Sequence, residues 1–127
     1  MNARTYNLSS ESSEQRRLME WAELNRQKYP MLRVLHSCPN GGMRNKTVAQ
    51  QLKAEGLKPG VPDLSLPYPS NGYNSLFIEM KRRVGGRLSD EQKLWREMLS
   101  EYGNKVVVAA GWEVAKDAII EYLTPKP

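Results

Sequence analysis

The sequence predicts an α/β domain in which helices flank one mixed β-sheet. Two observations support this class: segments with apolar residues at helical spacing alternate with short apolar runs, and turn residues separate the two kinds of segment. The expected order is helix, strand, helix, strand, strand, helix, strand and helix. With 127 residues the chain suits a single domain, 1–127, in which residues 1–10 form a flexible N-terminus.

The N-terminal part is expected to contain two helices and one strand. Apolar residues recur near helical spacing over 13–28, and Pro30 ends this first helix. Residues 33–38 have the composition of a short strand, and the Pro-Asn-Gly-Gly sequence at 39–42 is typical of a turn. A second helix is expected over 46–55.

The C-terminal part is expected to complete the sheet. Its elements are, in order, strand 63–67, loop 67–74, strand 75–81, a basic turn at 82–87, helix 89–102, strand 105–110 and helix 113–123. Gln92 follows Ser89 by three residues, so the two are expected to form a capping box at the start of a helix. Three tryptophans are expected to pack in the core: Trp21, Trp95 and Trp112.

Charge and cysteine content narrow the classes of function. Nineteen Lys and Arg against fourteen Asp and Glu give a net charge of +5 and a pI near 9.4, which suits a polyanionic partner. The single Cys38 argues against disulfides and against a cysteine-based zinc site. No apolar run has the length of a membrane span and the N-terminus lacks a signal peptide, so a cytoplasmic location without a membrane partner is expected.

The most informative pattern is a pair of acidic residues on two consecutive predicted strands. An antiparallel hairpin with Pro67 opposite Ser75 places Asp63 opposite Glu79, and neighbouring strands lie about 4.8 Å apart. Lys81 follows Glu79 by two residues, so it points to the same face of the sheet about 6.7 Å further along. Two carboxylates and an ammonium group are thus expected at one end of the sheet.

Such a cluster suits a hard divalent cation. Mg²⁺ prefers oxygen ligands, keeps several waters and binds through one or two carboxylates plus phosphate. Lys81 would then orient or deprotonate the attacking water, or neutralise charge on the phosphate. Glu-x-Lys is also a common surface pattern, but the apolar strand that leads into Glu79 and the matched position of Asp63 favour a site.

Several short motifs resemble those of the VRR-NUC branch of the PD-(D/E)XK nucleases. They span 14–123 and are Glu14-Gln15, Pro39-Asn40-Gly41-Gly42, Gly60-Val61-Pro62-Asp63-Leu64, Phe77-Ile78-Glu79-Met80-Lys81 and Leu88-Ser89-x-x-Gln92. The resemblance implies a restriction-endonuclease-like core. It also implies Mg²⁺ as cofactor, with Mn²⁺ as a substitute, held by Asp63, Glu79 and the backbone carbonyl of Met80. Lys81 corresponds to the catalytic lysine.

The resemblance also points to accessory residues, each with an alternative. It implies a supporting acidic residue on the first helix, where Glu14 fits best and Glu20 is the alternative. Gln92 is expected to contribute to the catalytic site, to cap its helix, or both. Asn40 is a turn former that, in view of the resemblance, borders the DNA-binding site.

Basic residues flank the predicted site in sequence. Those assigned to DNA binding are Arg44, Lys46, Arg82, Arg83 and Arg87. The alternative is a solvated basic surface with no phosphate contacts.

The small stand-alone members that the sequence resembles are viral or bacterial, cut branched DNA such as Holliday junctions, and form homodimers. This chain is therefore expected to be a metal-dependent endonuclease of branched DNA. The alternatives are a flap or restriction-like nuclease of the same fold, a non-catalytic DNA-binding module, and a protein-interaction domain. The loop 68–73 and the first helix are the two candidates for a dimer interface.

Overall fold

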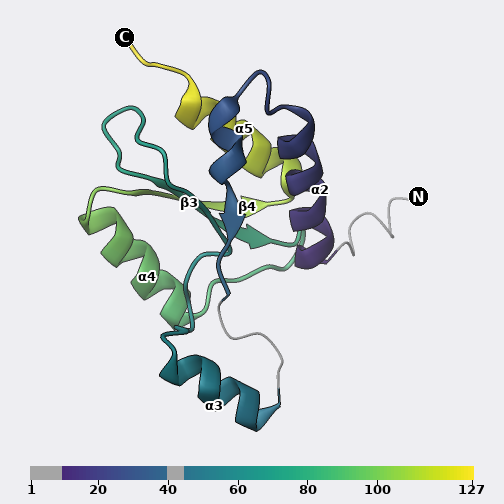
Figure 1. The fold of residues 1–127 in the computed structure, drawn as a ribbon, viewed down its shortest axis with the longest axis vertical. Helices are drawn as coiled ribbons and strands as arrows, with labels where there is room; N and C mark the ends of the chain where they lie inside the picture. Colours follow the sequence, from purple (N-terminus) through teal and green to yellow (C-terminus); the bar gives the residue numbers. More distant parts are fainter. Residues whose placement is uncertain (1–9, 40–44) are drawn as a thin grey trace.

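A four-stranded mixed sheet organises the fold, as the computed structural model of residues 10–39 and 45–127 shows (Figure 1). The strands are β1 (His36–Ser37), β2 (Leu64–Leu66), β3 (Leu76–Lys81) and β4 (Lys105–Ala110), and they lie in that order across the sheet. The β1–β2 and β2–β3 pairs are antiparallel, whereas β3 and β4 are parallel. The predicted mixed sheet is therefore confirmed.

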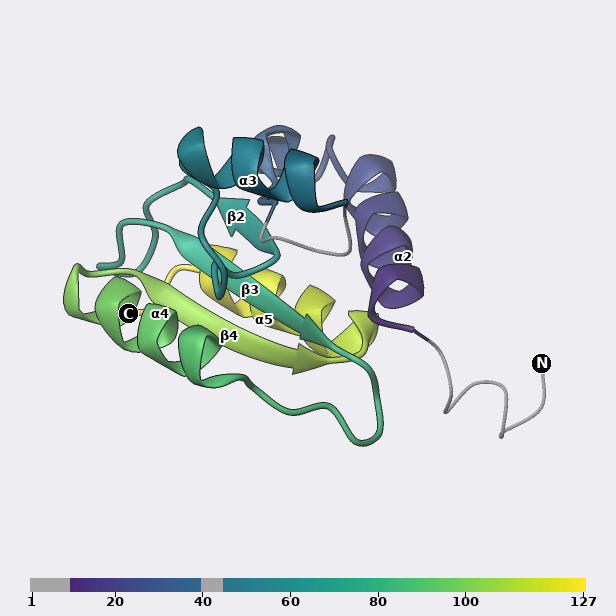
Figure 2. The same cartoon turned by 90° about the horizontal axis from the view of Figure 1, so that it is seen from below.

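Helices cover both faces of this sheet. They are α2 (Glu11–Leu24), the 3₁₀ helix η1 (Pro30–Val34), α3 (Lys46–Ala54), α4 (Asp90–Glu101) and α5 (Trp112–Leu123). α5 packs against β3, β4 and α2 on one face, and α4 packs against β4 on the other (Figure 2). The C-terminal end of β3 points toward α2 in this view. None of the described helices is long and apolar enough to cross a bilayer.

The core lies between the sheet, α2 and α5. Alternate residues of β3 point into it: Leu76, Ile78 and Met80 are fully buried. The other buried apolar residues of the core are Leu18, Ala22, Leu32, Leu35, Leu64, Leu66, Ala109, Ala115, Ile119 and Tyr122. The same alternation directs Glu79 and Lys81 away from this core and toward α4, so the packing of β3 decides which face carries its charged residues.

The β2–β3 hairpin has the predicted register. Leu64 lies opposite Ile78, Ser65 opposite Phe77 and Leu66 opposite Leu76. The capping box at the start of α4 and the strand over 105–110 are likewise confirmed. Of the tryptophans, Trp21 and Trp112 pack against the core, but Trp95 lies beside a separate cavity of about 410 Å³ near the end of α3.

The predicted boundaries were wrong near the N-terminus. The first helix begins at Glu11 rather than residue 13, because the Ser10 hydroxyl accepts a hydrogen bond from the Ser13 amide at 3.0 Å. It ends at Leu24, well before Pro30. Pro30 starts η1 instead of ending a helix, since its fixed φ suits the first position of a helical turn. The strand expected over 33–38 is thereby shortened to His36–Ser37.

Candidate active site

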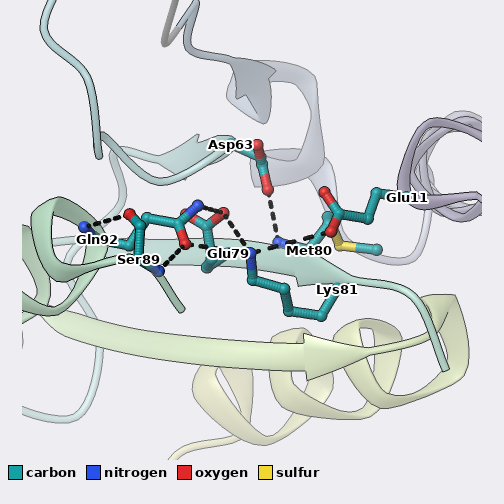
Figure 3. A network of polar contacts seen from close by, with 7 residues as sticks. All are labelled: Glu11, Asp63, Glu79, Met80, Lys81, Ser89 and Gln92. Atoms are coloured by element: carbon teal, nitrogen blue, oxygen red, sulfur yellow. Dashed lines mark hydrogen bonds and ion pairs between the residues drawn. The ribbon is translucent and has the colours of Figure 1, made fainter. Parts of the chain in front are cut away.

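The β2–β3 hairpin brings two acidic residues together at one end of the sheet. Asp63 directly precedes β2, and its Oδ2 accepts a hydrogen bond from the Met80 amide of β3 at 2.7 Å (Figure 3). Glu79 is the neighbour of Met80 in the same strand. The predicted pairing of Asp63 with Glu79 across the hairpin therefore agrees with the observed register and with this bond.

The first turn of α4 joins Glu79 to Lys81. Gln92 Nε2 donates a hydrogen bond to Glu79 Oε1 at 2.8 Å, and Gln92 Oε1 accepts one from Lys81 Nζ at 3.1 Å. The same Gln92 oxygen accepts a hydrogen bond from the Ser89 amide at 2.8 Å, which completes the capping box (Figure 3). Both interpretations of Gln92 are thus compatible: one side chain caps the helix and orients the two charged residues.

Glu79 lies in an environment that disfavours its charge. The residue is 3% exposed, and its Oε2 has no hydrogen-bond partner in the described part of the chain. Burial and the neighbouring Asp63 charge raise the pKa of Glu79 to about 8, although the Lys81 charge opposes this shift. At neutral pH this carboxyl group therefore retains a proton unless a cation compensates its charge.

The arrangement fits a hard divalent cation. Asp63 and Glu79 offer carboxylate oxygens, including the unpartnered Oε2 of Glu79. The Lys81 carbonyl accepts a hydrogen bond from Gly111 on the β4 side at 3.1 Å. Consecutive carbonyls of a strand point to alternate edges, so the Met80 carbonyl is directed to the Asp63 side.

The number of protein ligands also suits magnesium. The residues that the structure describes contain no group of three His, Cys, Asp or Glu side chains placed to hold a metal ion. Two carboxylates and a carbonyl leave several coordination positions for water and phosphate, which is the usual preference of Mg²⁺. Zinc and other ions that require three or four protein side chains fit the site less well.

The stability of the metal-free protein is expected to fall as pH rises from about 4.5 to about 8. Folded Glu79 keeps its proton up to a pKa of about 8, whereas the unfolded chain releases it near the ordinary value of 4.5. In this window the folded state binds more protons, so the free energy of unfolding decreases with pH. Denaturant unfolding in EDTA at several pH values, for wild type and Glu79→Gln, measures this effect. An equal pH dependence in both proteins would contradict it.

Glu14, the predicted acidic residue of the first helix, is not brought to this cluster. It is fully buried, and its Oε1 accepts hydrogen bonds from Arg83 Nη2 at 3.1 Å and from the Trp112 amide at 2.9 Å. Arg83 also pairs with Glu113. Glu14 and Arg83 therefore connect α2, the end of β3 and α5. This geometry does not support Glu14 as a site residue. It also does not support Arg83 as a phosphate contact.

Glu11 takes the position that was expected of Glu14. Its Oε1 lies 3.9 Å from Lys81 Nζ, and Glu79 Oε1 lies at the same distance from that nitrogen (Figure 3). Glu11 was not among the residues that the sequence predicted for the site. The available signal was its spacing, because Glu11 lies three residues before Glu14 on the same helix.

The alternative, Glu20, is exposed and lines a cavity of about 780 Å³. This cavity runs along α2 and reaches Asp63, so Asp63 is accessible from it. Glu20 therefore lies near the site without a described contact to Lys81 or Glu79.

The remaining basic residues differ in their placement. Arg82 and Arg87 are exposed and line a cavity of about 520 Å³ next to Glu11. Lys46 is exposed at the start of α3, a helix in which no residue is buried. Asn40 and Arg44 lie outside the described residues.

Comparisons with known proteins identify the family of this chain. The family model of the VRR-NUC domain matches residues 7–113, a segment that contains Glu11, Asp63, Glu79, Lys81 and Gln92. A solved structure described as a VRR_NUC domain protein is similar over 90% of this chain and 88% of its own, with 30% sequence identity and a TM-score of 0.77. A search of curated proteins gives no match. The restriction-endonuclease-like α/β core is thereby confirmed, and the chain belongs to the VRR-NUC family of nuclease-type domains.

Proposed function

We propose that this chain is a Mg²⁺-dependent endonuclease that hydrolyses phosphodiester bonds of DNA. The observation that carries the proposal is the cluster of Asp63, Glu79 and Lys81 at the end of one hairpin. The buried Glu79 Oε2 without a described partner supports a cation at this place. A non-catalytic DNA-binding module has no need of two carboxylates beside a surface that must accept phosphate.

Asp63, Glu79 and the Met80 carbonyl would hold the cation, and Mn²⁺ is expected to substitute for Mg²⁺. When bound, the cation would supply electrophilic activation of the scissile phosphate and a more acidic water. Gln92 keeps the Glu79 carboxylate oriented by its hydrogen bond at 2.8 Å. Asp63 is held in turn by the Met80 amide, so both carboxylates are positioned before any ligand binds.

Lys81 provides the positive charge of the site. Its side chain is 9% exposed, and Gln92 Oε1 holds its Nζ at 3.1 Å, which limits its motion. From this place the ammonium group would orient the attacking water or stabilise negative charge on the phosphate in the transition state. Glu11, at 3.9 Å from Nζ, replaces Glu14 as the proposed supporting acidic residue.

Branched DNA is the proposed substrate, and a flap or restriction-like specificity is the alternative. Cleavage of matched junction, flap, nicked and linear DNA, with Mg²⁺ or with EDTA, distinguishes these proposals. We expect cleavage only with Mg²⁺ and fastest on the junction. Preference for the flap would support the alternative specificity, and a lack of cleavage on every substrate with Mg²⁺ would contradict the nuclease proposal.

A homodimer is expected, because symmetric cleavage of a junction requires two active sites related by a two-fold axis. The loop 68–73 is fastened to the end of α5, since Ser70 Oγ and Asn71 Nδ2 both donate to the Tyr122 carbonyl. On α2, Met19 and Trp21 pack partly against the core, so they are not fully available to a partner. Sedimentation at micromolar concentration should give about twice the chain mass of 14.5 kDa. A monomer that cuts both strands of a junction symmetrically would contradict the dimer.

DNA affinity is expected to fall steeply with salt. With Arg83 paired to carboxylates, the proposed phosphate contacts are Arg44, Lys46, Arg82 and Arg87. Each neutralised phosphate contributes a slope of about −0.9, so log K should change with log salt by about −3.6. Fluorescence anisotropy over a salt series measures the slope, and Arg87→Gln should reduce its magnitude by about 0.9. A slope near zero would favour a protein-interaction domain.

A further inference from the structure

A cavity lies beside Lys81, between the first turn of α2 and the turn that follows β3. Its volume is about 520 Å³, and its lining includes Arg82, Gly85, Gly86, Arg87 and Glu11. This volume is within the range of roughly 300–1,000 Å³ that is usual for ligand pockets. The cavity therefore has room for a neighbouring group of a substrate that is bound at Lys81.

The arginines of this turn divide into two kinds. Arg83 is engaged by Glu14 and Glu113, so its charge is compensated within the fold. Arg82 and Arg87 are exposed, and neither forms an ion pair with any residue in the described ranges 10–39 and 45–127. Two guanidinium groups of the cavity lining thus remain available to a ligand.

The acidic group in the lining does not cancel these charges. Glu11 is the one carboxylate among the described residues that line the cavity, and its Oε1 lies 3.9 Å from Lys81 Nζ. Lys81 therefore offsets its charge, and the two arginines leave the cavity positive. Guanidinium groups present forked N–H donors that match phosphate oxygens, so a phosphate is the ligand that this lining favours.

Two glycines bring the cavity close to Lys81. A Cβ added at Gly86 would lie 3.0 Å from Lys81 Cβ and 3.4 Å from the Arg82 carbonyl oxygen, so a side chain here would force these neighbours to shift by a few tenths of an ångström. Gly85 has a φ of +77°, which L residues rarely adopt, and the Arg82 guanidinium lies over it. The Gly85-Gly86 sequence therefore allows the backbone that lines the cavity to approach the Lys81 side chain closely.

We propose that this cavity, which we call the Arg82–Arg87 pocket, is a subsite for a second phosphate of the DNA, next to the scissile phosphate on the same strand. The proposal rests on the proposed nuclease function and deepens it. The second phosphate has two possible sources: a phosphodiester within a continuous strand, or a phosphomonoester at a strand end. The pocket recognises the chemistry that both share.

The test measures whether the loss of one phosphate charge weakens DNA binding only when the two arginines are present. DNA duplexes and junctions carry one neutral methylphosphonate at each successive position, and their affinities are measured for the Glu79→Gln protein, in which cleavage is suppressed. At one position next to the cleavage site, the neutral group should weaken binding about tenfold, the usual order for a charged hydrogen bond. In the Glu79→Gln protein that also carries Arg82→Gln and Arg87→Gln, the same change should have no further effect.

The double variant Lys93→Gln and Arg96→Gln provides the matched control. Lys93 and Arg96 are exposed on α4 and line a different cavity, so their replacement removes two positive charges elsewhere. The methylphosphonate effect should persist in this variant. If the double arginine substitution and the methylphosphonate weaken DNA binding independently at every position, the subsite proposal is wrong.

A second set of DNAs identifies the source of the phosphate. It compares strand ends that carry a 5′-phosphate, a 3′-phosphate or a hydroxyl at the coupled position. If the effect of a terminal phosphate on affinity depends on the two arginines, the subsite binds a strand end. If only phosphates within continuous strands show this dependence, the subsite binds an internal phosphodiester. Cleavage by the unmodified protein is measured separately. Its absence overturns the nuclease proposal, whereas lost coupling with intact cleavage overturns the subsite alone.

Discussion

Replacement of Asp63 or Glu79 by alanine is expected to reduce DNA cleavage to background while DNA binding is unchanged or tighter. Each substitution removes a carboxylate that the proposed cation requires. Asp63→Ala also removes a negative charge close to the position of a phosphate, which favours binding, and Glu79→Ala does so above pH 8, where Glu79 is ionised without a cation. Cleavage with Mg²⁺ and DNA affinity in EDTA are measured on the same junction.

Asn and Gln variants separate charge from structure in this experiment. Asp63 Oδ2 accepts the Met80 amide at 2.7 Å, so Asp63→Ala leaves that donor without its partner. An unmade buried hydrogen bond costs about 1–3 kcal/mol, which lowers stability as well as activity. Asp63→Asn retains an acceptor oxygen and Glu79→Gln retains one for Gln92, yet both should be as inactive as the alanine variants.

Glu20→Ala is the control for this prediction. Glu20 is an exposed carboxylate of α2 that lines the cavity reaching Asp63, but it has no described contact with the cluster. Its replacement should leave cleavage close to that of the wild type. Near-normal cleavage by Asp63→Ala or Glu79→Ala in Mg²⁺ would show that the metal site is placed wrongly.

Lys81→Ala is expected to slow the chemical step about 10²-fold or more, while the protein still binds Mg²⁺. This is the usual range for a general base or for a donor that stabilises transition-state charge. Gln92 keeps its bond to Ser89, and Glu79 keeps its bond to Gln92, so the carboxylates remain oriented. Single-turnover cleavage gives the rate, and calorimetry gives the metal affinity.

The pH of the calorimetry matters because Lys81 lowers the pKa of Glu79, whose value is about 8. Without the lysine this pKa rises, and protons compete more strongly with the metal. Titrations are therefore compared above pH 8 as well as at neutral pH. Lys93→Ala, on the exposed side of α4, should leave both rate and affinity unchanged. Lost metal binding at every pH in Lys81→Ala would indicate a structural role for the lysine.

The proximity of Asp63 to the strand that carries Glu79 and Lys81 depends on short-range rules, and for this reason the sequence was sufficient to predict it. The turn residues between β2 and β3 set the hairpin register, and this register places Asp63 beside the strand that carries Glu79. The two-residue period of a strand directs Lys81 to the same face as Glu79. The capping box places Gln92 at the first turn of α4, three residues from Ser89.

The sequence was less informative where a short element depends on its surroundings. A composition typical of a strand over 33–38 did not show that Pro30 starts a 3₁₀ helix with Leu32 buried against the core. α3 has the predicted position, with Asn45 as its N-cap, but none of its residues is buried. Local propensity predicts that such an element exists, whereas tertiary contacts decide its length and its environment.

Only the tertiary structure decided which acidic residue of α2 faces the site and which arginine faces the solvent. The burial of Leu18 and Ala22 sets the rotation of α2, and this rotation buries Glu14 beside Arg83 and leaves Glu11 beside Lys81. Arg83 meets Glu14 across 69 positions of the chain, which no local pattern reports. The sequence by itself determined the hairpin and the pair of carboxylates, because neighbouring residues define both. The packing of α2 and α5 on the sheet determined the ion pairs of Arg83 with Glu14 and Glu113 and the approach of Glu11 to Lys81.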